Sequence, residues 1–160
     1  SRDMFFLSSI DDKGRPTVSY KGGTAGFVRV LDATTLVFPS YDGNGMFKSL
    51  GNISANAAVG MLFIDFENQK RMRLNGEATL HRDDALMPEY PEAQFIVRVR
   101  VREVFANCPR YIPKLQLVGP SDYVPQPGRD PVEPAWKGFD IFKGYVHPRQ
   151  PTARGDGGGG

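Results

Sequence analysis

Apolar and polar positions alternate along several stretches between residues 4 and 106, which is the pattern of half-buried β-strands. Residues 94–105 show it most clearly, since the valines at 97, 99 and 101 alternate with the arginines at 98, 100 and 102. Residues 71–82 alternate in the same way. Residues 58–66 form a nearly continuous apolar run, which favours a strand covered on both faces. The pattern therefore predicts three consecutive strands in this part of the chain.

Two hairpins are predicted before these strands. Residues 4–10 and 17–20 are separated by "DDKGRP", whose residues favour a turn, and residues 26–32 and 34–40 lie close enough to form a second hairpin. Many short strands with tight turns and a single helical segment indicate an antiparallel barrel or sandwich.

The segment "YDGNGMFKSLGNISAN", residues 41–56, predicts that one helix. Met46, Leu50 and Ile53 have helical spacing. We expect Asp42 or Asn44 to cap the helix at its N-terminus, and Asn56 to end it. These capping roles alone are enough to account for the residue types in this loop.

The same segment could also bind an anion. A helix N-terminus after small residues presents free N–H groups and partial positive charge, and Lys48 and Ser49 in the first turn could complete a phosphate site. Arg29 is the one charge inside the otherwise apolar run that ends at Asp32. A guanidinium there needs a partner. It either converges with Lys48 on this loop or pairs with a carboxylate, and the residues alone leave both alternatives open.

The charge balance and the cysteine count exclude several classes of function. A formal net charge of +2 is too small to favour non-specific binding to nucleic acid or to a membrane surface. The one cysteine, Cys108, excludes an internal disulfide, and His81 and His147 lie far apart, so a metal site has little to build on. We expect no membrane span and no signal peptide, and hence a cytoplasmic protein. Ser1 opens the chain, which leaves the completeness of the N-terminus open.

The other candidate chemistry is weaker. The arginines at 98, 100 and 102 could bind an acidic partner or nucleic acid, but cross-strand pairing with acids such as Glu77 is favoured. Cys108 is expected to be a structural thiol rather than a nucleophile. The chain has no "GxSxG" elbow for a serine nucleophile.

Composition changes after Pro109, since nine of the 13 prolines lie between residues 109 and 151. This part cannot be regular sheet. We expect a barrel domain over residues 1–118 and a proline- and aromatic-rich arm over residues 119–151 that packs on the barrel or on a dimer partner. Residues 152–160 are expected to form a flexible tail.

Four motifs together resemble the FMN-binding split barrels related to pyridoxamine 5'-phosphate oxidase. They are "YKGGTAGFVRVLD", "LVFPSYDGNGMFKSLGNISAN", "VGMLFIDFENQKRMRLNGEATL" and "FANCPRYIP", and the resemblance runs from about residue 5 to residue 113. It implies a mainly β fold, a six-stranded antiparallel split β-barrel with one short helix after strand 4. It also implies a homodimer with the flavin in a groove between the subunits.

The resemblance also implies site residues. In that family the strand matching residues 26–30 and the loop and helix matching residues 41–49 hold the flavin phosphate and one edge of the ring. The cofactor-binding candidates are Phe27, Val28, Arg29, Ser40, Tyr41, Asn44, Gly45, Met46, Lys48 and Ser49. The oxidases carry an Arg-Lys pair where this loop has Asn44 and Gly45, so Arg29, Lys48 and backbone N–H groups would hold the phosphate. Lys21, Arg110 and Tyr111 are the candidates for the substrate side.

The function implied is that of an FMN-dependent oxidoreductase acting on a small anionic or heteroaromatic substrate. The alternative is a non-catalytic protein that binds or carries flavin, the deazaflavin F420 or haem on the same barrel. The C-terminal substrate-binding pattern of the oxidase is not recognisable, so vitamin B6 oxidation is not carried over with the fold.

Overall fold

The computed structural model describes residues 2–142 and 144–145. This part of the chain contains seven strands, one α-helix and three short 3-10 helices. In chain order they are β1 Met4–Ile10, β2 Pro16–Gly22, β3 Arg29–Val30, β4 Thr35–Tyr41, α1 Lys48–Ala55, β5 Ala58–Asp65, β6 Lys70–His81, η1 Met87–Glu89, β7 Ala93–Ala106, η2 Ala135–Gly138 and η3 Asp140–Phe142.

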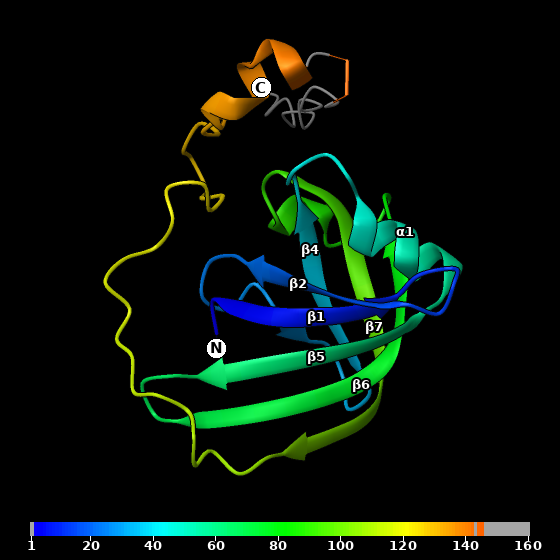
Figure 1. Cartoon of the computed structure of the whole chain (residues 1–160), viewed down its shortest axis with the longest axis vertical. Helices are drawn as coiled ribbons and strands as arrows, with labels where there is room; N and C mark the ends of the chain where they lie inside the picture. The colour runs from blue at the N-terminus through cyan, green and yellow to red at the C-terminus, as the bar shows by residue number, and fades with distance from the viewer. Residues whose placement is uncertain (1, 143, 146–160) are drawn as a thin grey trace, which may run out of the picture.

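All seven strands belong to one antiparallel sheet in the order β2-β1-β5-β6-β7-β4-β3. The long strands β6 and β7 curve, so that β1, β2 and β5 lie across β4 and β7 as a partly closed barrel (Figure 1). The mainly β antiparallel fold with one helix after β4 is confirmed. The sheet has seven strands instead of six because the two-residue β3 also pairs with β4.

β3 is much shorter than the predicted strand over residues 26–32, because turns take up both of its flanks. Gly26 has a φ of 89°, and the Phe27 N–H donates to Thr24 O at 2.9 Å. On the other side the Leu31 N–H donates to Thr35 O at 2.9 Å. Only Arg29 and Val30 are left to pair with β4.

The main core fills the inside of the curved sheet. Phe5 and Phe38 are almost fully buried and meet edge to face with ring centroids 4.9 Å apart. The predicted inward valines at 97 and 99 are fully buried. Leu50 and Ile53 of α1 belong to the same core cluster. Each such side chain contributes about 1.5–3 kcal/mol when buried, so the apolar face of α1 is strongly held against the sheet.

Gly76 lies where β6 and β7 change register, between Asn75 and Gly76. A Cβ at this position would lie 2.5 Å from the carbonyl oxygen of Arg100 and 2.9 Å from a methyl carbon of Val99. The two backbones can therefore approach this closely only with glycine, and the irregularity lies within the curved part of the sheet.

The outward-facing arginines of β7 pair with acids, as expected. Arg100 and Arg102 each bind Glu77 at 2.7 Å, and Arg98 Nε lies 2.6 Å from Asp84 Oδ2. Arg98 holds the pKa of Asp84 below its usual range, mainly through this hydrogen bond. All three arginines of the ladder are thus paired within their own chain, although Arg100 and Arg102 share one carboxylate.

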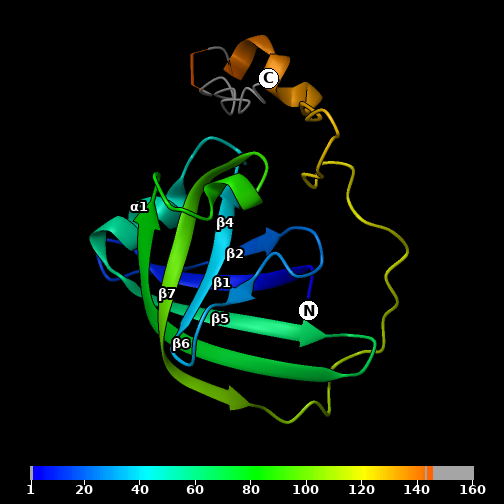
Figure 2. The ribbon, with the colours of Figure 1, turned by 180° about the vertical axis from the view of Figure 1, so that it is seen from behind.

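After β7 the chain runs along the outside of the barrel and ends in the turns η2 and η3, beyond the loop that follows β4 (Figures 1 and 2). The segment between β7 and the arm is held against the β5–β6 turn. Gln69 Nε2 donates to Ile112 O at 2.7 Å, and the Leu115 N–H donates to Phe66 O at 3.3 Å. Residues 146–151 of the predicted arm and the predicted tail, residues 152–160, lie outside the described residues.

Candidate functional site

A groove of about 430 Å³ lies between β2, the end of β4 and the start of α1. Residues 17–21, residues 40–41 and residues 43–50 line it. A second depression, formed by Glu92 and arm residues 122–126 and 129–132, has a volume of about 10 Å³ and holds no more than one water molecule. The groove is therefore the place to look for a ligand.

The polar wall of the groove consists of Lys21, Ser19 and Ser49. Lys21 Nζ donates to Ser49 Oγ at 3.3 Å, and the Ser49 and Ser19 hydroxyl oxygens lie 3.0 Å apart. Burial lowers the pKa of Lys21. Within the described part of the chain, no carboxylate forms an ion pair with this ammonium group. A partly desolvated cation with only a hydroxyl partner strongly favours an incoming anion.

A buried polar network sets the position of α1 on this wall. Asn52, which is only 7% exposed, donates through Nδ2 to Ser9 Oγ at 3.0 Å and to Thr17 Oγ1 at 2.9 Å. The Ser9 and Thr17 hydroxyl oxygens also lie 3.1 Å apart. Because a buried amide left without partners is costly, these bonds fix α1 over β1 and β2. Ser49, one turn before Asn52, then faces Lys21.

The prediction that Asp42 or Asn44 caps α1 is wrong, and the actual N-terminus leaves N–H groups at the groove. α1 begins at Lys48 with Phe47 as N-cap in the left-handed region, φ 49°, and no side chain caps it. Asn44 Oδ1 instead accepts the Met46 N–H at 3.1 Å, and Asp42 forms an ion pair with Lys137. The first-turn N–H groups of α1 therefore stay without a side-chain cap at the edge of the groove. The predicted end is confirmed, since Asn56 is the C-cap.

Arg29 does not join this group within one chain. Its guanidinium forms an ion pair with Glu89 of η1, so the carboxylate alternative is the one observed. Phe27 is buried in the core, 3% exposed, and Val28 packs against the core cluster. None of these three side chains lines the groove.

The remaining candidate residues fall into two groups, those that line the groove and those that do not. Seven of the cofactor candidates line the groove, namely Ser40, Tyr41, Asn44, Gly45, Met46, Lys48 and Ser49. Lys21, expected on the substrate side, lies among them. Arg110 and Tyr111 follow β7, are exposed and do not line the groove. Burial raises the pKa of Tyr41 to about 12, so its phenol is a neutral wall residue.

Sequence reasoning missed the contribution of β2. Thr17, Ser19 and Lys21 turn their half-buried side chains to one face, while Val18 and Tyr20 are 71% and 62% exposed on the other. A short edge strand with small polar residues alternating with exposed apolar ones is the signal that could have located it.

A family model described as pyridoxamine 5'-phosphate oxidase matches residues 1–119. The chain belongs to this family. The match confirms the resemblance seen in the motifs, and it ends before the turns η2 and η3. No curated protein sequence matches the chain significantly.

Solved structures agree with the family in fold. HupZ of Group A Streptococcus is 19% identical, with a TM-score of 0.52, covering 65% of this chain and 84% of HupZ. A proposed pyridoxamine 5'-phosphate oxidase of Lactobacillus delbrueckii is 25% identical, with a TM-score of 0.50, covering 66% of this chain and 85% of that one. General Stress Protein 26 of Bacillus anthracis is 12% identical, with a TM-score of 0.51, covering 66% and 84%.

The described residues contain neither a membrane-spanning helix nor a cluster of metal-ligating side chains. No helix there is long and apolar enough to cross a membrane. Nor do three or more histidine, cysteine, aspartate or glutamate side chains gather there in an arrangement that could hold a metal ion.

The Asn52 network leads to a first prediction. Asn52→Leu keeps the volume but removes both bonds to β1 and β2, so the free energy of unfolding should fall by about 1–3 kcal/mol. Urea unfolding followed by circular dichroism measures it. Ser54→Ala is the control on the same helix, because the Ser54 hydroxyl bonds only to the helix carbonyl of Leu50, at 3.1 Å. An Asn52→Leu protein as stable as the Ser54→Ala protein would show that the network does not hold α1.

Proposed function

We propose that this protein is an FMN-dependent oxidoreductase of the pyridoxamine 5'-phosphate oxidase family, acting on a small anionic or heteroaromatic substrate. The observation that carries the proposal is Lys21, a half-buried cation with a hydroxyl partner but no carboxylate, in a groove of about 430 Å³. Family membership supports the same conclusion.

The groove residues fit the phosphate end of FMN. Lys21, Ser19 and Ser49 offer an ammonium group and two hydroxyls within hydrogen-bonding distance of one another. Lys48, exposed at the first turn of α1, adds a second cation beside the uncapped N–H groups. Charge-assisted hydrogen bonds to a phosphate are about twice as strong as neutral ones, and so this end of the groove would anchor the ligand. In this proposal Lys21 takes the phosphate role that the family resemblance had suggested for Arg29.

The rest of the groove fits a flat heteroaromatic ring. Tyr20, Met46 and Phe47 line the groove with exposed apolar side chains, 62%, 68% and 39% exposed. A volume of about 430 Å³ lies within the usual range for small-molecule sites. When bound, the flavin itself supplies the hydride and electron transfer, and the protein supplies position, electrostatics and exclusion of water. Lys21 would hold the tail, while Met46 and Phe47 would cover the ring.

The deazaflavin F420 and haem are the alternative cofactors. A deazaflavin carries anionic groups that would use the same cations. Haem needs an iron ligand, which Tyr20, Tyr41 or Met46 could supply although the groove lining contains no histidine and no cysteine. The half-buried Lys21 beside Ser49 favours the phosphate of a flavin, and turnover with a reduced nicotinamide donor distinguishes an enzyme from a carrier.

A homodimer is part of the proposal. At the paired ends of β6 and β7, Met72 and Val104 lie on the same face of the sheet and are 41% and 53% exposed, an apolar area that a second copy of the chain would cover. Arg110 and Tyr111 follow this edge, which would let them act on the substrate side from the other subunit. Sedimentation velocity at micromolar concentration should give the dimer mass, and a monomer would contradict the assembly.

The flavin assignment is tested by titrating the apoprotein with FMN and following quenching of the flavin fluorescence. Lys21→Met and Lys48→Met should each weaken FMN binding, by about 10- to 100-fold for Lys21, because a charge-assisted bond is lost. Lys70→Met, an exposed lysine outside the groove, should bind like the parent. If Lys21→Met also binds like the parent, the phosphate does not lie in this groove. The absorption spectrum of the protein as purified adds the identity of any natural cofactor.

A further inference from the structure

An ion pair joins the C-terminal arm to the loop that lines the groove. Lys137 Nζ of η2 binds Asp42 Oδ2, and the two side chains are only 11% and 13% exposed. Glu133 Oε2 lies 3.7 Å from the same ammonium group. Lys137 lies beyond residue 119, where the family match ends, so this contact belongs to the part of the chain that the family model does not cover.

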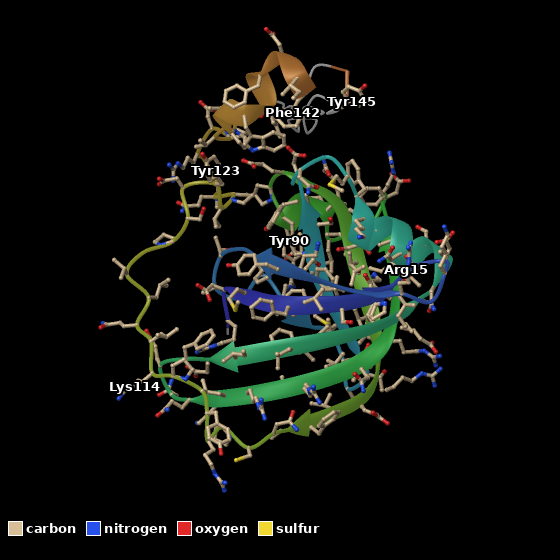
Figure 3. All side chains as sticks on the ribbon, viewed as in Figure 1. Arg15, Tyr90, Lys114, Tyr123, Phe142 and Tyr145 are labelled. Carbon is tan, nitrogen blue, oxygen red and sulfur yellow. The ribbon has the colours of Figure 1, made fainter. Side chains whose placement is uncertain are left out.

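The tip of the arm is packed so that it can present Lys137. The rings of Trp136 and Phe142 meet edge to face, with centroids 5.4 Å apart. The Lys137 N–H donates to Pro134 O at 3.1 Å, and the Phe139 N–H donates to Trp136 O at 3.1 Å. η2 and η3 form a compact unit beyond the end of β4, with Phe142 in it (Figure 3). An arm built from proline-rich chain thus ends in a unit that can hold a side chain in place.

The loop on the other side of the contact has little else to hold it. Residues 43–47 line the groove, and Gly45 and Phe47 both have positive φ, 74° and 49°. Met46 is 68% exposed. Asn44 bonds only within the loop, to the N–H and the sulfur of Met46. Exposed loops with few tertiary contacts open easily. The ion pair between Asp42 and Lys137 should therefore strongly affect how often this loop opens.

Because the Lys137–Asp42 ion pair is mostly buried, it depends on both of its partners. Charges removed from water stabilise the docked state only when they are paired, and removing Lys137 leaves the Asp42 carboxylate buried without its cation. Loss of Lys137 should therefore release the arm from the loop, whereas loss of the exposed Lys114, before the arm, should not.

We propose that Lys137 is a positioning residue for the groove: the C-terminal arm clamps the loop of residues 42–47 through Asp42 and holds it in the conformation that binds the ligand phosphate. The clamp itself stands independently of the ligand. Its effect on affinity rests on the proposed function.

The clamp is tested first without any ligand, by hydrogen exchange of the loop amides followed by mass spectrometry. Lys137→Met should speed exchange at residues 43–47 by about tenfold or more, because the loop opens more often. Lys114→Met, which changes an exposed lysine between β7 and the arm, is the matched control and should exchange like the parent. Lys137→Arg keeps the charge and should restore slow exchange. Parent-like exchange in Lys137→Met would overturn the clamp.

A double-mutant cycle tests the contact itself. Asp42→Asn and Lys137→Met should each speed exchange, and the double variant should be no faster than the faster single variant, since both remove one interaction. Effects that multiply in the double variant would show that the two residues act separately, and would overturn the proposal.

FMN titration of the same variants tests the positioning role. If the competent fraction of the loop falls to about one tenth, the apparent affinity falls about tenfold. Faster exchange with parent-like FMN affinity would overturn the positioning role. If the parent itself fails to bind FMN, the proposed function fails, and the exchange experiments still decide whether the clamp exists.

Discussion

The seating of α1 on the curved sheet is the constraint on which the site depends. Leu50 and Ile53 bind the helix to the core, and Asn52 locks its position through the hydroxyls of Ser9 and Thr17. Burial supplies the attraction, whereas the hydrogen bonds supply the register, because an amide placed one residue away would be buried without partners. That register brings Ser49 against Lys21.

The surroundings of Lys21 determine its pKa and its preference for an anion. The wall of β2 and α1 removes part of its water, which lowers its pKa, and the described chain gives it hydroxyls in place of a carboxylate. Such a group is more stable when an anion is present. The same wall has apolar side chains beside the cation, so the groove combines a charged end with a ring-sized apolar surface. A phosphorylated heteroaromatic molecule matches both halves.

The fold was predictable because local pattern and tertiary burial agree. Alternation located the strands of the valine and arginine ladder, and helical spacing located α1. The site was less predictable, since long-range partners decide it. Arg29 finds Glu89 sixty residues away, and Asp42 finds Lys137 ninety-five residues away, so neither guanidinium nor carboxylate was free for the role its neighbours suggested. Asn44 was taken as a helix cap, but its side chain closes a turn with Met46 instead. Lys21 is predicted on the substrate side, and the structure places it in the same groove as seven of the cofactor candidates, because the position of β2 against α1 is set by packing that spacing does not encode.

The central claim is that this groove recognises the phosphate of a flavin, and comparing FMN with riboflavin tests it most directly. The two ligands differ only in that phosphate, so fluorescence titration of the parent protein isolates its contribution. Two lysines, two hydroxyls and a helix N-terminus predict that FMN binds at least about tenfold more tightly than riboflavin. Equal affinities for the two ligands would contradict the account.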